Sequence, residues 1–425
     1  MVTLAGCGAT DWFDEEEERL EGTRIPVLVD QRSISPDGTG DIRVPPPFAI
    51  PDWPQNGGYP NHVVHHVELA SGLSVAWRAD VGSGNASDQR ITTPPIVEGG
   101  VVYAMDSEGQ VSAFDAATGA VKWRVNLTPD EDDDGHFGGG LAFDRGGLFV
   151  TGGFGQAIGL IADTGEEMWR ASLDAPVRGA PTVVAGRVLV VTTDNRLVAL
   201  DAREGTVIWE HQAVGESAGL VGGASPAEDR GMVVAAFTTG ELGAFDLGSG
   251  RMIWSNYLAG VSRTDPVATI ADIRGNPVID RGLVIGISNS GMMSAIEQAS
   301  GRRVWTRDIA GIENPWVAGD AIYLLTTDAE LVAIARATGR VAWVAGLPRY
   351  EDPEDREDPI VWSGPVLAGS QLYLVGSHGK AITVSPLTGE TTGGFDLSDG
   401  ARVPPIAAGG TLYIQTDDGA LTAYR

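Results

Sequence analysis

Cysteine, basic residues and long apolar runs are all scarce in this sequence of 425 residues. A single cysteine cannot form a disulfide within the chain, which excludes a scaffold held by internal disulfides. The 29 Lys and Arg against 57 Asp and Glu give a net charge of −28. A surface of that sign disfavours binding to nucleic acid and to anionic lipid headgroups. No apolar run approaches the roughly 18–20 residues with which a helix spans a bilayer.

A repeated tryptophan motif is present instead. Phe114–Trp123 (FDAATGAVKW) places a Thr-Gly turn four residues before a tryptophan. The same step recurs at Gly165–Trp169, Gly205–Trp209, Gly250–Trp254, Gly301–Trp305 and Gly339–Trp343, with the tryptophans 38 to 51 residues apart. A period of about 40–45 residues is typical of a four-stranded propeller blade. Because one blade cannot cover its own tryptophan, we expect the next blade to cover it.

Eight short segments rich in proline or glycine lead into β-rich runs, which gives the blade number. They begin near Thr93, Gly139, Gly179, Gly223, Gly275, Glu313, Gly364 and Val403. The predicted fold is therefore all-β: an eight-bladed β-propeller of four antiparallel strands per blade, over residues 53–425. The seventh blade carries Gly393 at the tryptophan position.

Both ends of the predicted propeller are incomplete. The last blade stops one strand short at Arg425, whereas residues 72–81, which carry Trp77, form a strand with no blade of their own. We predict that this N-terminal strand completes the last blade, because closing the ring removes open sheet edges.

The first 52 residues do not resemble a blade. Residues 1–7 end in Leu4-Ala5-Gly6-Cys7, which resembles the lipobox of bacterial lipoproteins, so we expect Cys7 to be lipidated and residues 1–7 to be the remainder of a signal. An ordinary exposed cysteine is the alternative. Six residues are too few for a whole signal peptide, so either the start codon is assigned too late or the chain was trimmed. Residues 8–52, acidic and proline-rich, are predicted to be an extended tether.

Candidate chemical sites are few. His62, His65 and His66 suggest a metal cluster, but no acidic or thiol partner stands at ligand spacing, which favours packing or capping. Asp130–Gly135 (DEDDDG) matches the first half of a calcium loop, but Leu141 stands where the loop needs a glutamate; a solvated acidic loop is the alternative. No nucleophile-elbow or phosphate-loop motif occurs. The sequence therefore nominates no catalytic, cofactor or metal residue.

The D-x-x-T-G-x-x-x-W unit resembles the tryptophan-docking repeat of PQQ-like propellers. Quinoprotein dehydrogenases of this type hold their quinone against adjacent cysteines and a calcium ion, and this chain has no such cysteine pair. A quinone-dependent dehydrogenase is the alternative from another functional class. Over residues 53–425 and the lipobox, the chain resembles the BamB family, alphaproteobacterial type: lipoprotein subunits of the outer-membrane β-barrel assembly machinery. That resemblance implies a non-catalytic scaffold without a cofactor, anchored by lipid on the periplasmic face of the outer membrane.

The resemblance also implies partners and contact residues. In that family, loops between blades bind the POTRA domains of BamA, the barrel-forming subunit. In the segment before the third blade, Val177 and Arg178 stand at the family's apolar and arginine positions, and Ala175 stands where a larger apolar residue is expected. In the segment before the fifth blade, Asp272 stands at the first of two acidic positions, and Arg274 replaces the second. Other subunits and nascent β-barrel proteins are further implied partners, and a periplasmic propeller with another partner remains an alternative.

Arginine suits such a contact because its planar fork binds carboxylates and carbonyls. The alternative is that Arg178 and Arg274 only brace their own loops through neighbouring carboxylates. If Arg178 contacts the partner, Arg178→Glu should abolish co-purification with BamA and leave thermal stability unchanged.

Overall fold

Every regular element among the described residues is a β-strand. This computed structural model describes residues 34–37, 42–129, 138–215, 220–258 and 271–425. By its contacts the chain divides into Met1–Ile34 and Ser35–Arg425, and the fold below is that of the second unit. Among the residues described, no helix is long and apolar enough to span a lipid bilayer.

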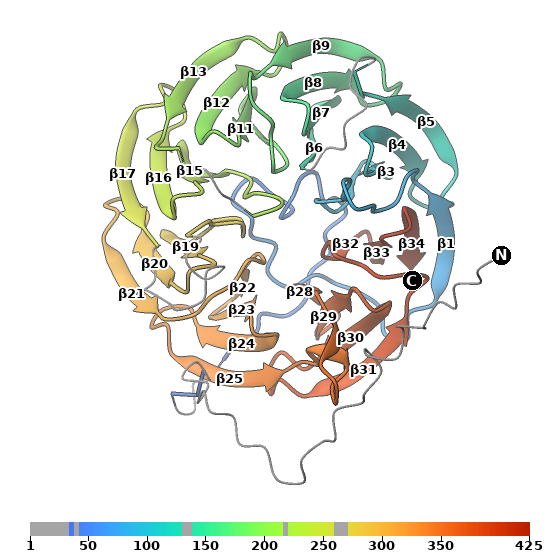
Figure 1. The fold of residues 1–425 in the computed structure, drawn as a ribbon, viewed down its shortest axis with the longest axis vertical. Helices are drawn as coiled ribbons and strands as arrows, with labels where there is room; N and C mark the ends of the chain where they lie inside the picture. Colours follow the sequence, from blue (N-terminus) through green and yellow to red (C-terminus); the bar gives the residue numbers. More distant parts are fainter. Residues whose placement is uncertain (1–33, 38–41, 130–137, 216–219, 259–270) are drawn as a thin grey trace, which may run out of the picture. The chain divides into compact units, whose positions relative to one another are not determined.

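Eight four-stranded antiparallel sheets, the blades, surround a common centre (Figure 1). Blades 1 to 4 contain β2 (Ile96–Glu98), β3 (Val101–Met105), β4 (Gln110–Asp115) and β5 (Val121–Asn126); β6 (Gly139–Asp144), β7 (Gly147–Gly152), β8 (Gln156–Ile161) and β9 (Glu167–Ser172); β10 (Thr182–Val184), β11 (Arg187–Val191), β12 (Arg196–Asp201) and β13 (Val207–Gln212); and β14 (Ala227–Asp229), β15 (Met232–Ala236), β16 (Glu241–Asp246) and β17 (Met252–Tyr257).

The second half of the ring repeats this plan. Blades 5 to 8 contain β18 (Val278–Asp280), β19 (Leu283–Ile287), β20 (Met293–Glu297) and β21 (Arg303–Arg307); β22 (Trp316–Ala318), β23 (Ala321–Leu325), β24 (Glu330–Ala335) and β25 (Val341–Gly346); β28 (Trp362–Ala368), β29 (Gln371–Gly376), β30 (Lys380–Val384) and β31 (Thr391–Asp396); and β32 (Ile406–Ala408), β33 (Thr411–Gln415), β34 (Ala420–Tyr424) and β1 (Val75–Asp80). A separate hairpin, β26 (Tyr350–Asp352) and β27 (Glu357–Pro359), lies between blades 6 and 7 in sequence.

The strand pattern of one blade follows from what each strand faces. The inner strand β2 turns into β3 through Gly99 and Gly100, which both have positive φ (57° and 76°), as a two-residue hairpin favours. The middle strands β3 and β4 are buried almost throughout, because neighbouring blades cover both faces. The outer strands instead alternate, and in β9 the side chain of Trp169 is buried while its neighbours are exposed.

The predicted ring closure is confirmed. β1 pairs antiparallel with β34, so that Trp77 lies opposite Ala423 in the last blade. Ser74 and Arg425 exchange two backbone hydrogen bonds of 2.8 and 2.9 Å, although 351 residues separate them. Blade 8 is thus built from both ends of the described propeller (Figure 1).

Each repeated tryptophan contacts the following blade. Its indole Nε1 donates to a backbone carbonyl next to the turn between the third and fourth strands of that blade, at 2.8–3.1 Å. The seven pairs are Trp77–Ala116, Trp123–Ala162, Trp169–Ala202, Trp209–Leu247, Trp254–Gln298, Trp305–Arg336 and Trp343–Pro386. The glycine of that turn lies beneath the indole ring, where a Cβ would come within 2.4–2.7 Å of ring atoms. The glycine and the tryptophan of the motif therefore belong to two different contacts, one with each neighbouring blade.

The chain before β1 runs through the centre of the ring. Residues 48–69, here called the axial segment, bond to the inner part of every blade. The contacts are Ile50 with Gly409 of blade 8, Trp53 with Val97 of blade 1, Pro54 with Phe143 of blade 2, Gln55 with Val183 of blade 3, Pro60 with Glu228 of blade 4, Asn61 with Ile279 of blade 5, His65 with Trp316 of blade 6, and Val67 with Leu367 and Gly369 of blade 7. Figure 1 shows this segment crossing the middle of the ring.

Part of the stretch predicted as a tether also contacts the blades. Ile50 is 2% exposed, and the Arg43 carbonyl accepts a hydrogen bond of 3.3 Å from the amide of Asp320 in blade 6. Asp37 exchanges hydrogen bonds with Val341 of β25. Residues 8–33 lie outside the described part of the chain, so the extent of the tether stays a prediction.

Two glycines of blade 1 test the tryptophan contact. Gly119 and Gly100 have nearly equal positive φ (74° and 76°), but only at Gly119 would a Cβ meet an indole, 2.6 Å from Cε3 of Trp77. We expect Gly100→Ala to cost about 1 kcal/mol of unfolding free energy for the backbone alone. Gly119→Ala should cost about 1–3 kcal/mol more, because it overpacks the contact. Urea unfolding of the two variants measures this difference, and equal losses would contradict it.

Candidate functional site at the centre of the ring

The segments that lead into the inner strands pack against one another around the centre. In the segment before blade 3, a Cβ on Gly179 would lie 2.6 Å from the Gly223 carbonyl of the segment before blade 4. In the segment before blade 5, a Cβ on Gly275 would lie 2.6 Å from the carbonyl of Glu313, before blade 6. Glycine at these positions allows the backbones of consecutive segments to approach closely. The two segments predicted to bind a partner are therefore fixed parts of this arrangement.

The structure joins these two predicted segments through an ion pair. Nη1 of Arg178 lies 3.0 Å from Oδ2 of Asp272, whose side chain is only 4% exposed. The same oxygen accepts the Leu220 amide at 2.7 Å, and the Arg178 carbonyl accepts the Gly139 amide at 3.0 Å. Arg178 therefore links segments that lead into blades 2, 3 and 5.

A second, weaker pair continues around the centre. Nη1 of Arg274 lies 3.8 Å from Oε1 of the buried Glu313. Burial raises the pKa of Glu313, and the Arg274 guanidinium opposes that rise. Both arginines thus have carboxylate partners within the propeller, but these lie in other segments and not in the arginines' own loops. Their side chains are still partly exposed, at 20% for Arg178 and 24% for Arg274.

The apolar members of the predicted contact differ in exposure. Val177 is 1% exposed, and its amide donates to the Gly152 carbonyl at 3.2 Å. Ala175 is half-buried, and its carbonyl lies 3.1 Å from the position of a Cβ on Gly155. Ala175 is therefore the more accessible of the two apolar positions. A partner contact by any of these five residues stays a prediction.

The Arg178–Asp272 pair changes what Arg178→Glu can test. The substitution would replace the cation that pairs with the buried Asp272 carboxylate by a second carboxylate. Unchanged thermal stability is therefore no longer the expected result. A partner test needs a substitution at an accessible uncharged position instead.

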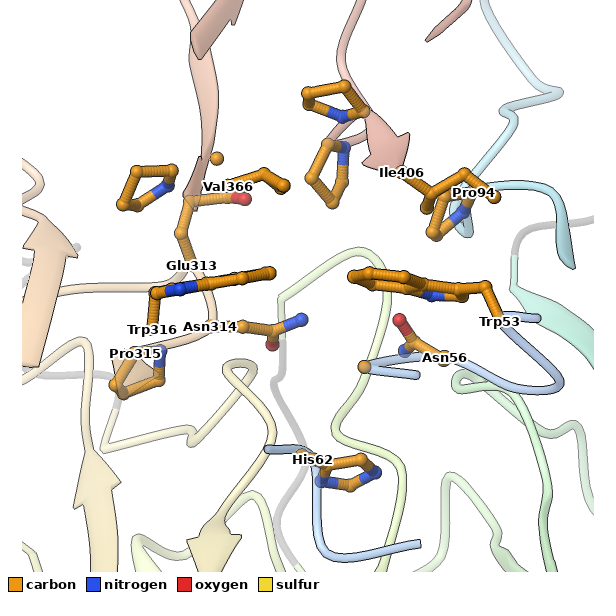
Figure 2. A pocket seen from close by; sticks show the side chains of 15 residues that line it. Trp53, Asn56, His62, Pro94, Glu313, Asn314, Pro315, Trp316, Val366 and Ile406 are labelled. Carbon is orange, nitrogen blue, oxygen red and sulfur yellow. The ribbon is translucent and has the colours of Figure 1, made fainter. Parts of the chain in front are cut away.

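The opposite half of the centre holds a small cavity between the axial segment and blades 6, 7, 8 and 1. Trp53 of the axial segment lies beside Trp316 of β22, with ring centroids 6.1 Å apart and planes inclined by 20°. Figure 2 shows the two indoles at one level, Val366, Ile406 and Pro94 on one side, and the carboxamides of Asn56 and Asn314 on the other. The cavity volume is about 40 Å³. Pockets for small-molecule ligands are typically about 300–1,000 Å³.

Two buried ring nitrogens in the lining of this cavity, Nε1 of Trp53 and Nε2 of His62, have no hydrogen-bond partner among the residues that the structure describes. Trp53, Trp316 and Glu313 are not among the site residues that the sequence predicts, although all three line the cavity. One signal was available: Trp53 and Trp316 are tryptophans outside the periodic glycine-to-tryptophan step.

The three clustered histidines each have a packing role. Nδ1 of His62 lies 2.7 Å from the Pro277 carbonyl, and Nδ1 of His66 lies 2.7 Å from the Pro45 carbonyl. Nε2 of His65 lies 3.8 Å from Oδ1 of Asp280. Burial lowers the pKa of His62 to about 4, although its bond to Pro277 opposes this shift. Within the described part of the chain, no group of three or more His, Cys, Asp or Glu residues is arranged to hold a metal ion.

Two predicted sites fall outside the described residues. Cys7 belongs to residues 1–33, and the possible calcium loop Asp130–Gly135 belongs to residues 130–137. Lipidation and calcium binding therefore remain predictions from the sequence.

Comparison with known proteins gives one family and a wider fold group. The sequence profile of the family described as outer membrane protein assembly factor BamB matches residues 61–134 and 107–345. The BamB of Moranella endobia is 22% identical over 353 residues, 82% of this chain and 89% of that protein.

Solved structures share the propeller. The crystal structure of BamB from Moraxella catarrhalis has a TM-score of 0.70 at 20% identity, covering 83% of this chain and 99% of that one. The quinohemoprotein alcohol dehydrogenase of Comamonas testosteroni has a TM-score of 0.68 at 14% identity, covering 88% of this chain and 80% of that one. At these identities the likeness of the structures concerns the fold and not the chemistry.

The Arg178–Asp272 pair should contribute measurably to stability. Arg178→Met keeps much of the apolar stem but leaves the buried Asp272 carboxylate, among the described residues, with the Leu220 amide alone, so we expect a loss of about 3 kcal/mol. Adding Asp272→Asn removes the unpaired charge and should recover at least half of that loss. Urea unfolding of both variants measures the coupling between the residues. Arg170→Met, which breaks the exposed pair with Glu167, is the control and should cost under about 1 kcal/mol. A double variant as unstable as Arg178→Met would contradict the pairing.

His62 should make stability depend on pH in the acidic range. Its pKa is about 4 in the folded protein, against about 6.5 in an unfolded chain. Below pH 6.5 the unfolded chain therefore binds a proton that the folded protein excludes, and stability falls as the pH drops towards 4.

This loss should reach about 2 kcal/mol at pH 5 relative to pH 7.5. His62 has φ of 58°, a conformation that asparagine tolerates, so His62→Asn removes the titration with little backbone strain. Unfolding at pH 7.5 and pH 5 should show a smaller loss in this variant than in the wild type. If the variant and the wild type lose the same unfolding free energy between pH 7.5 and pH 5, groups other than His62 cause the pH dependence.

Proposed function

The chain belongs to the BamB family, and on this premise we propose that it is a non-catalytic subunit of the machinery that assembles outer-membrane proteins. The observation that carries the proposal is the match of the family profile over more than half of the chain. The closed eight-bladed ring agrees with it, since a crystal structure of BamB aligns over 99% of its own length. In this role the propeller offers binding surface rather than reacting groups.

We place the contact with the POTRA domains of BamA at the segments before blades 3 and 5. Its residues are Ala175, Val177, Arg178, Asp272 and Arg274. The Arg178–Asp272 pair supports a single contact surface, because it holds the two segments against each other. The side chains of Arg178 and Arg274 are partly exposed, and each guanidinium has further N–H donors that could bind carboxylates or carbonyls of the partner. Other subunits and nascent β-barrel proteins are further proposed partners.

The arrangement at the centre favours this role over a quinone-dependent dehydrogenase. The axial segment bonds to all eight blades there, and the cavity beside it is about 40 Å³. If the chain bound another periplasmic partner instead, that protein would replace BamA in the purification described below.

We further propose that Cys7 anchors the protein by lipid at the periplasmic face of the outer membrane. The sequence Leu4-Ala5-Gly6-Cys7 supports this. Acyl chains would then hold the protein at the membrane without a spanning helix.

Affinity purification from detergent-solubilised envelopes tests the proposal. The wild-type chain should co-purify with BamA. Ala175→Glu should reduce the amount of BamA at least about tenfold, because it puts a carboxylate at an accessible position beside the proposed contact. Val207→Glu adds the same charge to the outer strand of the same blade, at a 54% exposed position, and should have no effect.

Neither glutamate variant should change the melting temperature, which separates lost binding from lost folding. Retention of BamA by Ala175→Glu would overturn the proposed contact, and its absence from the wild-type eluate would overturn the function. In the same cells, Cys7→Ser should move the protein from the membrane fraction to the soluble periplasmic fraction.

A further inference from the structure

One boundary between blades lacks the tryptophan contact that the other seven have. This boundary, between blades 7 and 8, is called the seam here. Blade 7 carries Gly393 at the tryptophan position, and Phe395 packs instead on Tyr424 of blade 8 at 5.0 Å between ring centroids. A tryptophan at position 393 would have no turn to contact. The third and fourth strands of blade 8, β34 and β1, come from opposite ends of the chain and are not joined by one.

The axial segment crosses the seam on its inner side. Its first part contacts blade 8, where the Ile50 carbonyl accepts the Gly409 amide at 2.7 Å. Its last part contacts blade 7, where the Val67 amide donates to the Leu367 carbonyl at 3.1 Å and the Val67 carbonyl accepts the Gly369 amide at 2.9 Å. The segment therefore begins on one side of the seam, passes the other six blades in order, and ends on the other side.

The two parts of the segment are also bonded to each other at the seam. The Phe48 amide donates to the His66 carbonyl at 3.0 Å, and the Phe48 carbonyl accepts the Glu68 amide at 2.9 Å. Phe48 thus pairs in parallel with Val67, and Val67 pairs in parallel with Ala368 of β28. Continuous backbone pairing runs from blade 7 through both parts of the segment towards blade 8.

Side chains also stabilise the junction, the place at the seam where the two parts of the axial segment meet. Ile50, Val67 and Leu69 lie in one buried apolar cluster with Ala368 of blade 7 and Ala407 of blade 8. Nε2 of His66 accepts the Ser370 amide at 2.9 Å, so its Nδ1 carries the proton that is donated to the Pro45 carbonyl. The apolar cluster at the junction is buried, and both ring nitrogens of His66 have hydrogen-bond partners.

We infer that residues 48–69 act as a strap that closes the propeller from inside at the seam, in place of the missing tryptophan contact. The seam is then the place where the ring opens, and it opens only when the strap releases. Opening there would separate Pro365 of blade 7 from Pro404 and Pro405 of blade 8, which line the central cavity together. The strap is independent of the proposed binding to BamA, because it concerns contacts within one chain.

Hydrogen exchange on the full-length protein tests this inference. The Val67, Gly369 and Gly409 amides should exchange as one cooperative unit in the wild type, with the same dependence on denaturant. The Glu228 and Ile279 amides, which bond to Pro60 and Asn61 of the same segment away from the seam, are the internal reference.

A single backbone change should release the strap. Phe48→Pro removes the amide that bonds to His66, at a position already preceded by Pro45-Pro46-Pro47 and 44% exposed. It should speed exchange at Val67, Gly369 and Gly409 about tenfold, the effect expected for one lost hydrogen bond. The Glu228 and Ile279 amides should exchange at an unchanged rate. Phe48→Ala keeps the amide and should match the wild type throughout.

Two results would overturn the inference. One is exchange in Phe48→Pro that rises equally at all five amides, or at none of them. The other is independent exchange of the Val67, Gly369 and Gly409 amides in the wild type, a measurement that decides the matter even if the variant does not fold.

Discussion

The indole N–H of each repeated tryptophan, bonded to a carbonyl of the next blade, is the interaction on which the ring depends. In seven places the bond joins the outer strand of one blade to a turn of its neighbour, with 2.8–3.1 Å between the indole Nε1 and the carbonyl oxygen. The indole fits there because the turn contributes a glycine, which leaves room for the ring and takes the positive φ that the turn requires. The bond also satisfies a buried donor that would otherwise be costly.

This interaction explains why so much of the fold could be predicted from sequence. In the regular repeats the turn glycine and the tryptophan stand four residues apart. A short stretch of sequence therefore indicates the contacts of a blade with both of its neighbours. The blade number followed from the eight entry segments, and the place of Trp77 from the strand that the last blade lacks. Gly393, read from sequence as a degenerate repeat, has a physical reason in the structure: blade 8 has no turn between β34 and β1 for a tryptophan to contact.

The path of the axial segment could not be predicted in the same way. It is held mainly by backbone amides and carbonyls, and these groups leave no residue pattern to read. Its prolines and polar residues have the composition of a tether, whereas Ile50 and Trp53 are almost completely buried. The candidate site shows a similar limit. Sequence resemblance placed Arg178 and Asp272 in two separate segments, 94 residues apart, and nothing in the spacing indicated that they pair with each other.

The pairing of Ser74 with Arg425 has a consequence for how the protein is made. The two residues are separated by 351 positions, and a contact of such separation requires the closure of a long loop. Seven blades can be synthesised while the eighth still lacks β32, β33 and β34. During that time β1 has no strand to pair with. The ring can close only once β34 has been made, and a chain without β34 would leave β1 an unpaired edge.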